Sequence, residues 1–139
     1  MSVFSFVDGV SEVKKGESLT AFFKLKPREE YLKDHFADFP VMPGVLQLEA
    51  LKQAASKFLA ESEGVLENYR LQSVGAVKFG RFVSPGASLQ IFVRFLKKQN
   101  GASFFEGRID VMEKDKPPSR AVLADFSLLP VKSRSFLKS

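Results

Sequence analysis

The segment of residues 35–50, HFADFPVMPGVLQLEA, contains the residue types that an acid-base reaction needs. His35 is the only histidine in the chain, and Glu49 follows it by fourteen residues in a largely apolar run. A neutral imidazole can remove a proton near pH 7, and a carboxylic acid kept protonated in an apolar pocket can donate one. Such a pair would suit proton removal next to a carbonyl, with loss of a leaving group from the neighbouring carbon.

Gly44 lies between these two residues, directly after Pro43, where a helix is expected to begin. The first N–H groups of a helix have no intrahelical acceptor, so they can bind a developing oxyanion. Glycine has no side chain that would block a substrate's approach to them. Plainer explanations stay open for each group: a surface or structural histidine, a solvated helix glutamate, and a Pro-Gly pair that only marks a boundary.

Composition excludes several other kinds of site. The 139 residues include no cysteine, which rules out disulfides, thiolate metal sites and a cysteine nucleophile. A single histidine argues against a histidine-based metal cluster. The chain contains no G-x-S-x-G elbow, no phosphate-binding loop and no G-x-G-x-x-G motif. We therefore expect neither a metal nor a cofactor.

The net charge of +5 favours an acidic partner, although a merely soluble surface would explain it equally well. Most of the 15 phenylalanines fall in apolar segments, which favours a core or an apolar channel over nucleic-acid binding. No run approaches the roughly 18 apolar residues of a membrane span. The N-terminus lacks the pattern of a secretory signal. We expect a cytoplasmic protein that binds neither nucleic acid nor a membrane.

The sequence pattern predicts two strands, one long helix and then three or four long strands. Strands are expected at residues 3–10 and 18–26 with a turn at KKGE, followed by one short helical turn at PREEYL. A helix is expected over residues 45–61, ending at Gly64. Its expected core residues, at helical spacing, are Leu48, Leu51, Ala55, Phe58 and Leu59.

Further strands are expected within residues 69–83, 88–98, 102–113 and 120–131, separated by the turn signals SPG, QNG and KDKPPS. This order predicts an α+β fold in which one helix packs on an antiparallel sheet of about six strands. We expect a single domain over residues 1–130 and a basic tail over residues 131–139. Dimerisation would be one way to cover the remaining face or edge of the sheet.

The opening segment resembles the signature of the β-hydroxyacyl-acyl carrier protein dehydratases, which reads roughly H-F-P-G-x-P-x-M-P-G-V-L-x-x-E-A. The residues in register are His35, Phe36, Pro40, Met42, Pro43, Gly44, Val45, Leu46, Glu49 and Ala50. The later segments VGAVKFGRFVSPG, FFEGRIDV and AVLADFSL resemble strands of the same family. The chain departs from the family at Ala37-Asp38, where Pro-Gly is usual, and at Lys52, where an uncharged residue is usual.

The resemblance implies the hotdog fold, in which an antiparallel sheet wraps one long central helix. It implies that His35 takes the C2 proton of a 3-hydroxyacyl thioester and that Glu49 protonates the departing C3 hydroxyl. The Gly44 N–H would polarise the thioester carbonyl, Gln53 would orient Glu49 from one turn further along the helix, and Arg70 would support the helix. The family's site lies at a dimer interface, with histidine and acid from different subunits.

The implied reaction is dehydration of (3R)-hydroxyacyl-acyl carrier protein thioesters to trans-2-enoyl thioesters, in fatty acid or related acyl-chain synthesis. Glutamate at position 49 resembles the plain dehydratase branch, so no isomerisation is expected. Homodimers or higher assemblies are implied, and the candidates for contact with the acidic carrier protein are Lys78, Arg81, Lys97 and Lys98. Two alternatives are a non-catalytic hotdog module that binds acyl chains or carrier protein, and a hotdog thioesterase.

Overall fold

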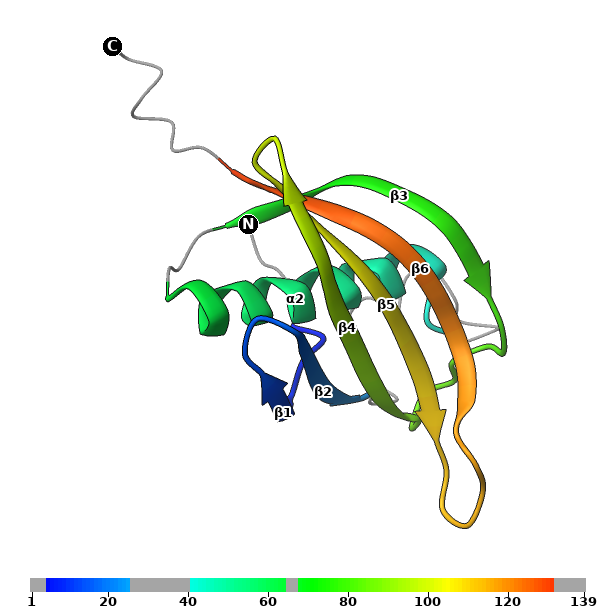
Figure 1. The fold of residues 1–139 in the computed structure, drawn as a ribbon. Coiled ribbons are helices and arrows are strands. Elements are labelled where there is room, and N and C mark those ends of the chain that lie inside the picture. Colours follow the sequence, from blue (N-terminus) through cyan, green and yellow to red (C-terminus); the bar gives the residue numbers. More distant parts are fainter. Residues whose placement is uncertain (1–4, 26–40, 65–67, 132–139) are drawn as a thin grey trace.

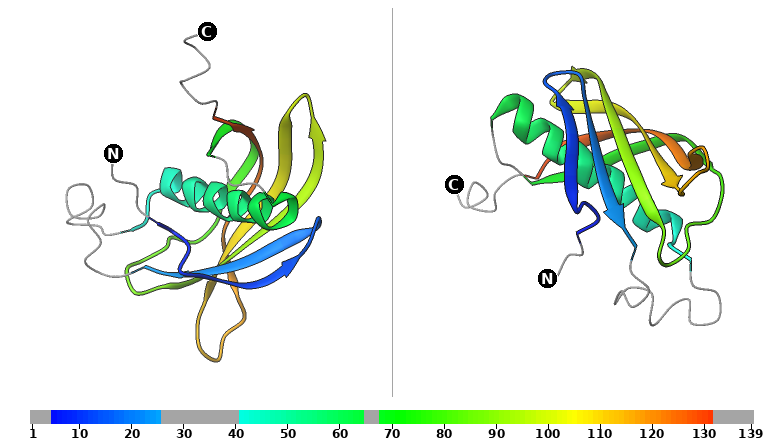
Figure 2. Two further views of the ribbon diagram at one scale, coloured as in Figure 1. Left: turned by 90° about the vertical axis from the view of Figure 1, so that its left-hand side faces the viewer. Right: turned by 90° about the horizontal axis from the view of Figure 1, so that it is seen from below.

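The helix α2, Gly44–Glu63, lies against the concave face of a curved six-stranded sheet (Figure 1). The computed structural model describes residues 5–25, 41–64 and 68–131. The strands are β1 (Gly9–Lys14), β2 (Ser18–Lys24), β3 (Tyr69–Phe79), β4 (Ser88–Gln99), β5 (Ala102–Met112) and β6 (Ser119–Pro130). Figure 2 shows the sheet curving around the helix, as the hotdog fold requires.

The sheet has the order β1-β2-β4-β5-β6-β3, and all neighbouring strands are antiparallel. The expected antiparallel arrangement of the last three strands is confirmed. The order also places β3 beside β6 and leaves β1 and β3 at the two edges. Strand periodicity did not predict these long-range neighbours, because it says which face a residue occupies and not which strand lies next to it.

Local turn chemistry explains the hairpin between β4 and β5. Asn100 and Gly101 have φ angles of 53° and 83°, as the two central residues of a type I′ turn require. The helix ends as expected at Gly64, whose φ of 70° forms a left-handed C-cap. The QNG and Gly64 predictions are therefore confirmed.

The core lies between α2 and the sheet. Every second residue of β4 faces the helix, so Leu89, Ile91 and Val93 are buried. The buried helix residues are Gln47, Ala50, Leu51, Ala54, Ala55, Phe58 and Leu59. Four of the five expected core positions of the helix are confirmed. Leu48 packs against the core only in part, because it lies at the margin of the buried stripe.

The boundaries of several elements differ from those expected. The first strand runs over Gly9–Lys14 instead of residues 3–10, because residues 5–8 precede the ladder that begins at the Gly9–Phe22 pair. The strand expected over residues 69–83 ends at Phe79, and the chain then passes alongside residue 42, whose N–H donates to the carbonyl of Val83 at 2.7 Å. The PREEYL turn lies outside the described residues.

The division into a domain over residues 1–130 and a basic tail stays a prediction, although β6 does end at Pro130. Within the described ranges, no helix combines the length and the apolar character needed to cross a membrane.

Candidate active site

Glu49 lies in the second turn of α2, with about a quarter of its side chain exposed. Its Oε2 atom accepts a hydrogen bond from Gln53 Nε2 at 3.1 Å. The same oxygen lies 3.1 Å from Lys52 Nζ. These donors sit four and three residues further along the helix, which places all three side chains on one helix face. Glu49 is therefore a held carboxyl group.

The amide of Gln53 is held in turn by the N-terminal segment. Gln53 Oε1 accepts a hydrogen bond from the backbone N–H of Phe6 at 2.7 Å. Phe6 is 1% exposed, and its ring packs edge-to-face on Phe23 at 5.7 Å. Because the amide oxygen must face the Phe6 N–H, the NH₂ group must face Glu49. A buried backbone group thus sets the direction of the donor that reaches the carboxyl.

Gly44 begins α2, as expected. The residue before it, Pro43, makes no side-chain cap hydrogen bond, and its carbonyl accepts from the N–H groups of Leu46 and Gln47. Among the described residues, the N–H groups of Gly44 and Val45 have no hydrogen-bond acceptor. A Cβ atom on Gly44 would come within 2.7 Å of Cζ of Phe79. The ring of Phe79 therefore lies over the Cα atom of Gly44. Phe79 itself is 54% exposed. A side chain at position 44 would therefore have to displace the exposed ring of Phe79.

Gln47 fixes the segment that leads into the helix. It is only 4% exposed, and its Nε2 donates to the backbone carbonyl of Met42 at 3.2 Å. Its Oε1 has no hydrogen-bond partner in the described part of the chain. Gln47 lies three residues before Ala50, on the same buried face of the helix. This spacing alone did not show that Gln47 is buried.

His35, Ala37 and Asp38 lie outside the described residues, so the pairing of His35 with Glu49 stays a prediction. Arg70 is exposed on β3, opposite Leu129 of β6. Among the described side chains it forms no ion pair or hydrogen bond with Glu49 or Gln53. Its supporting role also stays a prediction.

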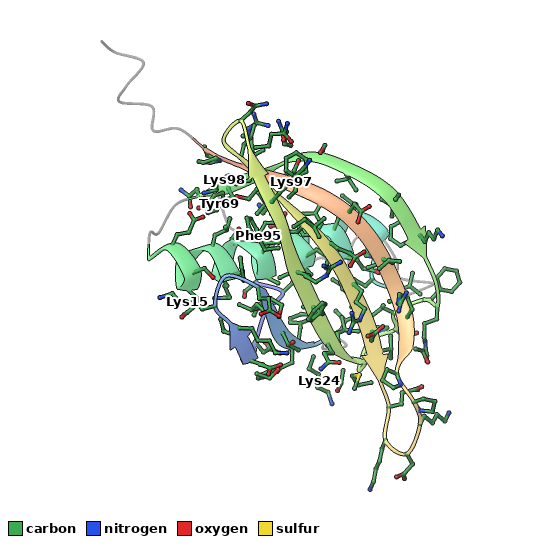
Figure 3. The ribbon with its side chains drawn as sticks, viewed as in Figure 1. Lys15, Lys24, Tyr69, Phe95, Lys97 and Lys98 are labelled. Carbon is green, nitrogen blue, oxygen red and sulfur yellow. The ribbon has the colours of Figure 1, made fainter. Side chains whose placement is uncertain are left out.

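The four candidate carrier-contact residues fall into two groups within one chain. Lys98 pairs with Glu63 at the C-terminal end of α2, at 2.7 Å, and Lys97 lies over the Phe104 ring. Figure 3 shows Lys97 and Lys98 together toward one end of the sheet and Lys24 toward the other. Lys78 directly precedes Phe79 and Arg81 follows it by two residues, and the ring of Phe79 lies near Gly44 at the start of the helix. The 20-residue helix between the groups spans about 30 Å.

Two contacts of this site were not predicted from the sequence. The link from Phe6 to Gln53 joins residues 47 positions apart, and the packing of Phe79 on Gly44 joins residues from different elements. Lys52 was noticeable in the sequence as an unusual charge near Glu49. Within the described residues, no group of three His, Cys, Asp or Glu side chains could hold a metal ion.

Comparison with known proteins agrees with this geometry. The ApeI-like family, described as ApeI dehydratase, matches residues 11–114. The chain belongs to the ApeI-like dehydratase family. The 3-hydroxyacyl-[acyl-carrier-protein] dehydratase FabZ of Levilactobacillus brevis is 36% identical to this ApeI-like chain over 110 residues. That match covers 78% of this chain and 74% of the relative. The family resemblance expected from the sequence is confirmed, and so is the enzyme class, a hydro-lyase.

Solved structures share the fold of this ApeI-like dehydratase. The dehydratase heterocomplex ApeI:P from Xenorhabdus doucetiae matches with a TM-score of 0.74 and 16% identity, covering 96% of this chain and 87% of that one. The hexameric thioesterase y2039 from Yersinia pestis matches with a TM-score of 0.64 and 13% identity, covering 81% and 85%. At these identities the likeness concerns the fold, and it confirms the expected hotdog architecture.

Proposed function

We propose that this ApeI-like dehydratase removes water from 3-hydroxyacyl thioesters carried by an acyl carrier protein and produces trans-2-enoyl thioesters. The observation that carries the proposal is the hydrogen bond from Gln53 to Glu49, which holds the motif's carboxyl group on α2. The FabZ relative, whose name states this substrate class, supports it at 36% identity. Glutamate at position 49 supports dehydration without isomerisation.

In the proposed reaction His35 removes the C2 proton, and the electron pair of that C–H bond forms the C2–C3 double bond. The C3–O bond breaks, and its electrons leave with the oxygen. Glu49 protonates this oxygen, so the leaving group departs as water. The first N–H group of α2, at Gly44, stabilises the charge that develops on the thioester oxygen. No cofactor is required for this balance.

We also propose that the enzyme is a homodimer or an assembly of dimers, with His35 and Glu49 of one site coming from different subunits. The position of β3 at one edge of the sheet supports this arrangement, because no described strand pairs with its outer side, and such an edge offers backbone groups to a second strand. The absence of cysteine from the sequence fits a cytoplasmic location, which we keep as part of the proposal.

A thioesterase is the second candidate, because the Yersinia pestis thioesterase has the same fold. The two reactions differ in product. A thioesterase releases a free thiol and an acid, whereas a dehydratase keeps the thioester and changes the acyl chain. A module that only binds acyl chains or carrier protein would produce neither change.

The test uses purified protein and a 3-hydroxyacyl chain loaded on acyl carrier protein. Mass spectrometry of the carrier should report loss of water with the thioester intact, and a thiol reagent should report no release. His35→Ala and Glu49→Gln should each abolish the change. Full activity in both variants would refute the dehydratase proposal, and thiol release that depends on Glu49 would favour the thioesterase.

A further inference from the structure

We propose that Lys52 is a positioning residue for the acid step: with Gln53, it holds Oε2 of Glu49 as a permanent acceptor, so that Oε1 is the oxygen that exchanges the proton. This inference rests on the proposed function, because it assigns a role to each oxygen of the proposed acid. It concerns a lysine that the family signature does not contain.

A hydrogen bond and an ion pair converge on one oxygen of Glu49. Gln53 Nε2 and Lys52 Nζ each lie 3.1 Å from Oε2 of Glu49. Neither group can reverse its role at this oxygen. The ammonium of Lys52 has no acceptor atom, and Gln53 must present its NH₂ group because its oxygen accepts from the Phe6 N–H. Oε2 is thus an acceptor in every state of Glu49.

The contacts at Oε2 also determine which oxygen of Glu49 can carry the carboxyl proton. A protonated carboxyl carries its hydrogen on one oxygen. An oxygen that already accepts a hydrogen bond from Gln53 and lies 3.1 Å from an ammonium group is a poor place for a further hydrogen. When Glu49 carries a proton, the proposal places that proton on Oε1. No hydrogen bond to Oε1 is formed within the ranges that the structure describes. This oxygen is the one left to meet the C3 hydroxyl of a substrate.

The same contacts should stabilise the transition state of proton transfer from Glu49. Negative charge develops on Glu49 as its proton moves to the departing hydroxyl. The amide donor of Gln53 and the ammonium of Lys52 already lie 3.1 Å from the carboxyl group that receives this charge. Donors that are in place before the reaction stabilise the transition state without reorganisation. A charged donor contributes more than a neutral one, so Lys52 should matter to kcat even though it need not touch substrate.

The packing of the network supports a positioning role. About a quarter of each side chain of the Lys52–Glu49 pair is exposed, so water screens this pair less than a fully solvated one. The partner amide of Gln53 is anchored on a buried residue of the N-terminal segment, Phe6. Lys57 on the same helix is exposed and serves as a comparison.

The test compares Lys52→Met, which keeps a long side chain without the charge, with Lys57→Met, which removes the same charge from the exposed position. Both are assayed on the carrier-bound substrate, with thermal unfolding measured for each. We expect Lys52→Met to lower kcat roughly 10-fold, from loss of the ion pair at Oε2, with little change in KM. Lys57→Met should match the wild type.

Lys52→Arg is the rescue variant, because guanidinium restores a cationic donor near Oε2 and should recover much of the lost kcat. Lys52→Gln supplies a second uncharged variant if Lys52→Met folds poorly. The inference is overturned if Lys52→Met behaves like Lys57→Met, or if removal of the cation raises kcat. Glu49→Gln separates the two levels: an inactive Glu49→Gln beside an unaffected Lys52→Met refutes only the role of Lys52, whereas a fully active Glu49→Gln refutes the proposed function.

Discussion

Glu49 differs from a solvated helix glutamate because two side chains, Gln53 through a hydrogen bond and Lys52 through an ion pair, reach the same carboxyl oxygen. One of them, Gln53, is directed by a backbone N–H that the chain cannot rotate away without moving the buried ring of Phe6. The orientation of this carboxyl is therefore coupled to the packing of residues far away in the sequence. A substitution at Gln53 can therefore test whether its NH₂ group must face Glu49.

Gln53→Glu tests that direction. The new carboxylate can still accept from the Phe6 N–H, but it cannot donate to Glu49 and places a like charge beside it. We expect kcat to fall by roughly 10-fold or more, while the melting temperature changes little. Steady-state kinetics and thermal unfolding measure the two effects. Gln53→Glu with wild-type kcat would show that the donor to Oε2 is dispensable.

Glycine at position 44 avoids a clash with the Phe79 ring and could also leave room for substrate. A pair of variants separates these two effects. Gly44→Ala should clash with Phe79, since the new Cβ would lie 2.7 Å from the ring. Because the ring of Phe79 is exposed and can move, we expect destabilisation at the low end of overpacking, about 1 kcal/mol. Phe79→Ala should relieve the clash in the double variant.

If Gly44 also leaves room for substrate, the double variant should recover stability in urea unfolding but only part of kcat/KM. Recovery of both would mean that packing against Phe79 alone explains the glycine. Failure to recover stability would contradict the close contact between these two residues.

At the scale of elements, the edge strand β3 contains an irregularity that the sequence pattern did not indicate. Its register with β6 shifts between Gly75 and Lys78, and Ala76 in this bulge has a φ of 50°. Alanine is disfavoured in this left-handed region because its Cβ approaches the carbonyl oxygen. The bulge bends the strand that forms the open edge of the sheet.

Ala76→Gly should therefore stabilise the protein by up to about 1 kcal/mol, after the entropy cost of glycine is subtracted. Gly101→Ala is the matched control with the opposite sign, because Gly101 has a φ of 83° in a turn. Urea unfolding measures both. A lower stability for Ala76→Gly would mean that the bulge does not strain the alanine.

Close packing between α2 and the sheet depends on another glycine, Gly107 of β5. A Cβ there would come within 2.9 Å of Leu51 on the helix and of Phe126 on β6. The small residues Ala54 and Ala55 similarly leave room on the buried helix face. The distance between helix and sheet thus follows from small side chains at the points of contact.

At the scale of the whole molecule, the proposed intersubunit site makes a prediction about mixed dimers. If His35 and Glu49 of a site come from different subunits, two inactive variants can complement each other. In a mixed dimer of His35→Ala and Glu49→Gln, one site combines both defects and the other combines both intact residues. After unfolding and refolding together, the mixture should recover roughly a quarter of wild-type activity, the share expected for random pairing in two-fold dimers.

Each variant refolded alone is the control and should stay inactive. Light scattering on the same samples reports whether dimers form. An inactive mixture in which mixed dimers are demonstrated would contradict the intersubunit site and would assign His35 and Glu49 of one chain to the same site.

Much of this protein was determined by local features of the sequence. The helix and its C-cap follow from helix-forming residues and Gly64, and the β4–β5 hairpin follows from Asn100 and Gly101, because these preferences act within a few residues. The family motif likewise indicated Glu49, Gly44 and the enzyme class, since motif spacing is a property of the chain itself.

Only the tertiary structure decided which distant segments meet. The pairing of β3 with β6, the packing of Phe79 on Gly44 and the bond from Phe6 to Gln53 all join residues from different parts of the chain. Periodicity identifies the face that a residue occupies but carries no information about its neighbour across that face. The sequence therefore indicated Glu49 as the candidate acid, and the fold determined which of its carboxyl oxygens is held.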